Sequence, residues 1–161
     1  MKDLCKHDDL LIFNQIKAKD LILEFTVYLL VALFLLTAVS KLMDLDKFTW
    51  QINNQVLDNR FTPYLVYGLP AAELLLAILL PWPKTRLIAL YGSALMMTVF
   101  TVYIGLVTFK VFDRVPCGCA TAFEHLTWPQ HLIMNATITL LSFVAIYIET
   151  NRKINTNRKT A

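Results

Sequence analysis

The chain has 161 residues, of which 57% are hydrophobic and only 17% are charged, a composition too apolar for an ordinary water-soluble domain. Because one membrane-spanning helix takes about 20 apolar residues, the length allows four spans and excludes a separate soluble catalytic domain. The net charge of +3 fits basic residues that flank membrane helices and meet anionic lipids, so we expect membrane lipids and no nucleic acid as partners.

Four long apolar runs predict an all-α membrane protein, a four-transmembrane-helix bundle. In chain order the runs cover residues 21–42, 64–82, 87–109 and 129–148, and each is long enough to cross a bilayer. We therefore expect a cytoplasmic N-terminal segment over 1–20, a four-helix membrane domain over 21–149 and a cytoplasmic basic tail over 150–161. The tail is short and polar, so we predict that it is disordered.

The segment 44–63, between the first two runs, mixes aromatic and aliphatic residues with polar ones. This spacing is typical of an outer amphipathic segment at the membrane interface, which as a short helix would cover the mouth of the bundle. The alternative is a loop whose aromatic residues only anchor helix ends.

Lysine and arginine are distributed unequally between the two sides that four spans define. The tails and the segment between the second and third runs carry ten, whereas the other two connections carry five. Because cytoplasmic segments are enriched in basic residues, we predict a multi-pass protein of the bacterial cytoplasmic (inner) membrane with both termini in the cytoplasm. Cys5 then lies on the reducing side as a free thiol.

On the opposite side, between the third and fourth runs, Cys117 and Cys119 are separated by one glycine. A disulfide between them needs a tight turn, which Gly118 permits because glycine adopts positive φ, and its geometry should be strained. Strain raises the reduction potential and favours thiol exchange, whereas closing so short a loop adds little stability. We therefore interpret Cys117 and Cys119 as a catalytic redox pair rather than a structural bridge.

Metal binding is the competing interpretation of the same segment. With His125 and His131, the cysteines Cys117 and Cys119 would form a Cys2His2 set that suits zinc or copper. Their spacing does not match the common zinc-finger or zinc-ribbon patterns, and each histidine has an ordinary structural interpretation. The redox hypothesis is therefore preferred.

Glu73 is the single charged residue inside the second run. A charge near the centre of a bilayer costs about 2.5–3.5 kcal/mol, so this carboxylate should face the bundle interior. It is expected to relay protons or bind a quinone-like cofactor, or else to clasp helices by pairing with Lys41 or Asn135. His131 and Asn135 are four residues apart and share one helix face. They therefore join Glu73 and Lys41 in the candidate cofactor site, unless they only bond neighbouring helices.

Four short features point to a known family. They are Thr37-Ala38-Val39-Ser40-Lys41 at the end of the first run, Leu69-Pro70-Ala71-Ala72-Glu73 in the second, Pro116-Cys117-Gly118-Cys119 between the third and fourth, and Asn135 in the fourth. They resemble the methylamine utilisation protein MauE family and its DoxX-like relatives from residue 21 to about residue 148. The resemblance implies a role in methylamine metabolism, in processing, export or maturation of the disulfide-rich small subunit of methylamine dehydrogenase. The architecture is also similar to membrane disulfide-generating proteins of the DsbB and vitamin K epoxide reductase type, which pass electrons to quinone.

Our first functional hypothesis is a membrane thiol-disulfide oxidoreductase that supports maturation of an extracytoplasmic protein. Its partner would be a periplasmic thioredoxin-like or disulfide-containing protein, because the similar disulfide-generating proteins use two cysteine pairs and this chain has one outer pair. The alternatives are a non-enzymatic accessory subunit for assembly or export, and a carrier of a metal or small molecule.

Overall fold

The computed structural model describes residues 2–54, 59–111 and 127–160, and over these residues it contains helices and no strand. The helices are α1 (Lys2–Met43), α2 (Leu45–Asn53), the 3-10 helix η1 (Asn59–Phe61), α3 (Thr62–Leu79), α4 (Arg86–Thr108) and α5 (Trp128–Thr160). Four segments are long and apolar enough to span a membrane: Lys17–Met43, Asn59–Leu79, Arg86–Thr108 and Trp128–Thr156. The predicted all-α fold with four spans is confirmed.

The lengths of α1 and α5 follow from the positions of glycine and proline. The sequence has neither residue before Pro63 nor after Pro129, so nothing in α1 or α5 breaks the backbone hydrogen bonds. Helix α1 therefore continues through the boundary expected near residue 20, and α5 continues to Thr160. The prediction of a disordered tail is wrong for the described residues of the tail. Its polarity suggested disorder, but the segment contains no glycine or proline, so the helix continues through it.

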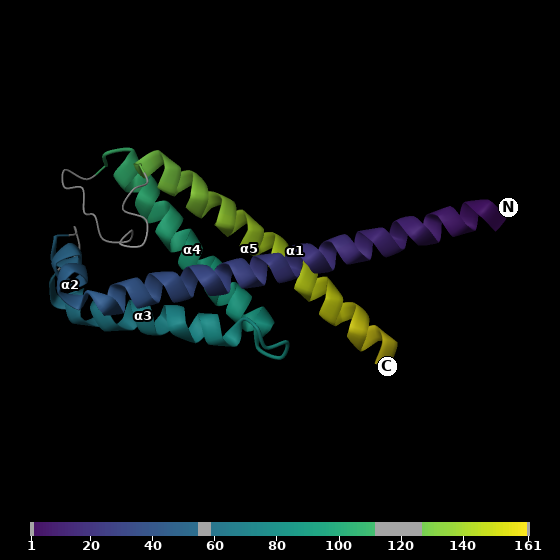
Figure 1. Cartoon of the computed structure of the whole chain (residues 1–161), viewed down its shortest axis with the longest axis horizontal. Helices are drawn as coiled ribbons and strands as arrows, with labels where there is room; N and C mark the ends of the chain where they lie inside the picture. Colours follow the sequence, from purple (N-terminus) through teal and green to yellow (C-terminus); the bar gives the residue numbers. More distant parts are fainter. Residues whose placement is uncertain (1, 55–58, 112–126, 161) are drawn as a thin grey trace.

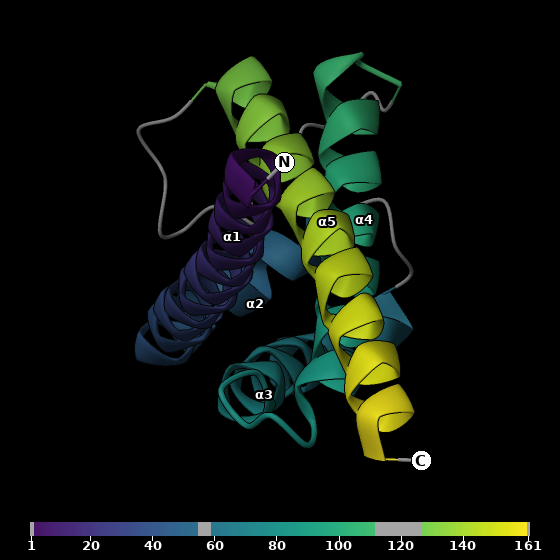
Figure 2. The same cartoon turned by 90° about the vertical axis from the view of Figure 1, so that its right-hand side faces the viewer.

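The long helices pack in antiparallel fashion, α1 against α3 and α5, and α4 against α5 (Figures 1 and 2). One stripe of α1 is buried at spacings of three and four residues, which repeat on one helix face. Its members are Leu23, Val27, Leu30, Phe34, Ala38 and Lys41. Other faces of the spans expose large apolar side chains, such as Phe25 and Leu36, as expected where helices contact lipid.

The amphipathic segment after α1 forms the short helix α2. The carboxylate of Asp44 begins this helix by accepting a hydrogen bond from the Lys47 backbone N–H at 3.0 Å. Phe48 and Ile52 are buried against Val66 of α3, while Trp50 is exposed. The interpretation as a short helix over one end of the bundle is therefore confirmed (Figure 1).

The bundle has two ends that differ in chemistry. At one end, which we call the cavity end, α1 and α4 finish and α3 and α5 begin. At the other, which we call the tail end, α3 meets α4 and the terminal parts of α1 and α5 extend outward (Figure 1). Both ends carry charged side chains at helix interfaces, and the candidate site lies towards the cavity end.

Candidate functional site

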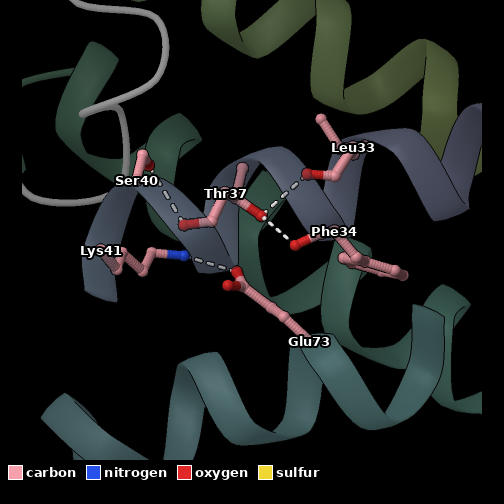
Figure 3. A network of polar contacts seen from close by, with 6 residues as sticks. All are labelled: Leu33, Phe34, Thr37, Ser40, Lys41 and Glu73. Atoms are coloured by element: carbon pink, nitrogen blue, oxygen red, sulfur yellow. Dashed lines mark hydrogen bonds and ion pairs between the residues drawn. The ribbon is translucent and has the colours of Figure 1, made fainter. Parts of the chain in front are cut away.

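Lys41 of α1 and Glu73 of α3 form an ion pair inside the bundle. Lys41 Nζ donates a hydrogen bond to Glu73 Oε1 at 2.5 Å, and the two side chains are only 2% and 1% exposed. Figure 3 shows the side chains pointing towards each other across the two helices. The contact between Lys41 and Glu73, one of those considered from the sequence, is therefore present.

The helical repeat explains why these two side chains meet. Val66, Pro70, Glu73 and Ala77 are the buried positions that follow Thr62 in α3, at spacings of four, three and four, and the stripe of α1 that ends at Lys41 faces them. A buried ion pair loses hydration worth several kcal/mol per charge, so mutual attraction must offset that cost.

Two aromatic rings surround the ammonium group of Lys41. Its Nζ lies 5.8 Å from the ring centroid of Phe48 in α2 and 5.9 Å from that of Phe100 in α4. At these distances the ring faces attract a desolvated cation. Sequence analysis did not assign Phe48 or Phe100 to the site, because an aromatic residue in an apolar or amphipathic run carries no signal that separates it from ordinary core.

The second oxygen of Glu73 is available for another interaction. Oε2 is buried and has no hydrogen-bond partner among the described residues. The hydroxyl of Thr37 lies close enough to interact with the Glu73 carboxylate, but it donates to the carbonyls of Leu33 and Phe34 on its own helix, at 2.9 and 3.2 Å (Figure 3). A buried acceptor left in this state is an exception in folded proteins, and it can accept a hydrogen bond or a proton from a small molecule.

A small cavity lies beside the ion pair. Its volume is about 40 Å³, enough for water, which needs roughly 10–15 Å³ by the same measure. Pockets for organic ligands measure about 300–1,000 Å³, so the cavity between the described residues is water-sized rather than ligand-sized. The lining comes from α1 (Leu33, Phe34, Thr37, Lys41), α3 (Glu73), α4 (Met97, Phe100, Ile104) and α5 (His131, Met134, Asn135).

His131 and Asn135 reach this cavity from the first turns of α5. Both are buried, and the Asn135 side-chain amide donates to the His131 backbone carbonyl at 3.0 Å. The His131 ring is tilted by 43° against that of Trp128, with centroids 6.4 Å apart. The structure therefore brings together four residues selected from the sequence, one from α1, one from α3 and two from α5.

Cys117, Cys119 and His125 lie outside the described residues, so the structure tests neither the redox pair nor the Cys2His2 alternative. Within the described ranges, no group of three or more His, Cys, Asp or Glu side chains is placed to hold a metal ion. The chain that carries the cysteines leaves α4 after Thr108 and enters α5 at Trp128, both at the cavity end.

The comparisons with known proteins agree with the sequence motifs. The family model described as methylamine utilisation protein MauE matches residues 19–148. This range contains all residues that line the cavity as well as Cys117 and Cys119. No curated protein and no solved structure matches the chain.

Proposed function

The chain belongs to the MauE family of methylamine utilisation proteins, and from that premise we propose that it is a membrane thiol-disulfide oxidoreductase. It supports the maturation of an extracytoplasmic partner by exchanging disulfides through Cys117 and Cys119. The observation that carries the proposal is the buried ion pair of Lys41 and Glu73 beside a water-sized cavity. This pair lies towards the end of the bundle where the cysteine-containing connection joins α4 and α5.

The exchange balances without a further reactant. A partner thiolate attacks one sulfur of the Cys117–Cys119 disulfide, forming a mixed disulfide and releasing the other sulfur as a thiolate. The second partner thiolate then attacks the mixed disulfide and releases the remaining cysteine. The partner is oxidised by two electrons, Cys117 and Cys119 are reduced, and two protons move from the partner thiols to theirs.

Glu73 and Lys41 handle protons in this proposal. Ionisable side chains inside a membrane bundle are expensive and by default mark proton or substrate pathways. A buried ion pair can usually be replaced by apolar residues at little cost in stability, so stability alone gives no reason to keep it. The Oε2 atom of Glu73 lacks a described hydrogen-bond partner, and water in the cavity would connect it with His131 and Asn135, which share the lining.

The exchange test uses purified protein in lipid nanodiscs and a thioredoxin-like dithiol as partner. We expect Glu73→Gln to remain folded, because the amide oxygen still accepts from Lys41, and to slow exchange about 100-fold, a typical contribution of acid-base groups. The matched control is Asp46→Asn, which changes an exposed carboxylate of α2 outside the cavity. Cys117→Ser or Cys119→Ser should trap the mixed disulfide.

Three outcomes would contradict the proposal. Full activity of Glu73→Gln would make the ion pair a structural clasp. Unchanged partner maturation in the Cys117→Ser/Cys119→Ser variant would favour the accessory-subunit function. Cysteines that stay reduced under oxidising conditions and hold a stoichiometric metal would establish the Cys2His2 site instead.

The proposed orientation places the cavity end in the periplasm, where a partner protein has access. It is supported by the ten-to-five distribution of basic residues. After reduction, a membrane-impermeant maleimide added to intact spheroplasts should label Cys117 or Cys119 and spare Cys5. Permeabilised cells provide the control in which Cys5 also reacts, and labelling of Cys5 alone in intact spheroplasts would reverse the orientation.

A further inference from the structure

A second pocket lies at the tail end of the bundle and is lined mainly by charged side chains. Its volume is about 440 Å³, within the range of about 300–1,000 Å³ for ligand pockets. Three helices and the connection before α4 contribute to its wall. The lining residues are Glu24 of α1, Pro83, Arg86 of α4, and Glu149, Arg152, Lys153 and Thr156 of α5.

The wall of this pocket contains a buried donor that lacks a partner. Arg86 is 6% exposed; its Nη1 donates to Glu24 Oε1 at 2.7 Å and its Nη2 to the Pro81 carbonyl at 3.4 Å. The third donor atom, Nε, is buried and has no hydrogen-bond partner in the described chain. An unsatisfied buried guanidinium donor points to an acceptor supplied by a ligand.

The lining of the same pocket also includes a buried acceptor, on Glu149 of α5. Glu149 is 4% exposed, and its Oε2 forms no hydrogen bond to any described residue. Arg152 forms a long ion pair with this oxygen, because its Nη1 lies 4.0 Å away, and its side chain is 54% exposed. A ligand that suits this pocket therefore carries an oxyanion and also a hydrogen-bond donor.

Charge and position narrow the class of ligand. Three cationic side chains and two carboxylates line the pocket. The lining therefore carries one net positive charge, which matches a ligand with a single negative charge. The pocket lies where α4 begins and near the tail-side limits of the apolar runs in α1 and α5, and basic pockets at this level bind phospholipid headgroups.

We propose that this pocket binds the phosphate of an anionic glycerophospholipid with a hydroxylated headgroup. The phosphodiester accepts hydrogen bonds from Arg86, Arg152 and Lys153, and a headgroup hydroxyl donates to Glu149 Oε2. The acyl chains remain in the bilayer beside the helices. Such a lipid would link α1, α4 and α5 at the tail end, whatever reaction the cavity end performs.

The test compares lipids on delipidated full-length protein in detergent, with native mass spectrometry and the thermal midpoint as readouts. Phosphatidylglycerol should bind at one copy per chain and raise Tm, whereas phosphatidylcholine and soluble glycerol phosphate should do neither. Arg152→Gln should weaken phosphatidylglycerol binding about fivefold, the usual effect of one basic residue at an anionic membrane surface. Arg158→Gln makes the same change at an exposed arginine of α5 outside the pocket and should keep the wild-type affinity.

Two results would overturn the assignment. Equal binding of phosphatidylcholine, or equal losses in Arg152→Gln and Arg158→Gln, would show general attraction to the membrane rather than a site. A full rise of Tm with glycerol phosphate alone would make the pocket a site for a free phosphate compound and not for a lipid.

Discussion

Each end of the bundle contains a basic side chain paired with a glutamate across two helices, but the two pairs differ in how far they are exposed. Lys41 and Glu73 are 2% and 1% exposed, whereas Arg86 and Glu24 are 8% and 39% exposed. The distances are similar, 2.5 and 2.7 Å, so the main difference is exposure. Desolvation dominates the free energy of a buried pair, whereas a pair in contact with water contributes little in either direction.

This comparison separates two uses of charge in one small membrane protein. At the cavity end, each charge depends on its partner, and both are kept although apolar residues would fill the space at lower cost. That is the pattern expected of a functional pair. At the tail end, Glu24 is partly exposed. Arg86 Nε has no hydrogen-bond partner among the described residues and lies in the wall of a larger pocket, as expected of a site that binds a ligand.

The largest effect is expected from breaking the buried pair. Lys41→Met or Glu73→Leu should each lower the free energy of unfolding by about 3–5 kcal/mol, because each leaves an uncompensated charge in the interior. The double variant should lose much less than the sum, since no charge is left unpaired. Unfolding by denaturing detergent in mixed micelles measures all four corners of this double-mutant cycle.

The control for this cycle is Asp46→Asn at the same end, where the side chain is exposed and the change should stay within about 0.5 kcal/mol. If the double variant instead lost the sum of the two single effects, Lys41 and Glu73 would not be energetically coupled, and the comparison between the two ends would fail.

The parts of this site that can be predicted from sequence are those that depend on residues close together in the chain. Apolar runs fix the four spans, and a lone carboxylate in such a run must face inward, which identifies Glu73. The helical repeat places His131 and Asn135 on one face. Lys41 is found as the basic residue at the end of the adjacent span, within reach of Glu73.

The remaining features depend on contacts between distant segments. Phe48 and Phe100 surround Lys41 only because α2 folds over the cavity end and α4 packs nearby. The size of the cavity follows from side-chain packing that no periodicity describes. Arg86 counted from the sequence only as a topology charge, since its contact with Glu24 joins residues 62 positions apart.

A smaller effect is expected at the tail end, and it completes the comparison. Glu24→Gln should lower the free energy of unfolding by no more than about 1 kcal/mol, because the carboxylate is 39% exposed and the amide oxygen still accepts from Arg86. Raising the salt concentration from about 0.05 to 0.5 M should reduce this small difference further, since screening acts on hydrated charges. The cost of Glu73→Leu should hardly respond to salt. Detergent-driven unfolding at both salt concentrations measures the two responses. If Glu24→Gln lowered the free energy of unfolding as much as Glu73→Leu and independently of salt, exposure would not decide what an ion pair contributes to stability in this bundle.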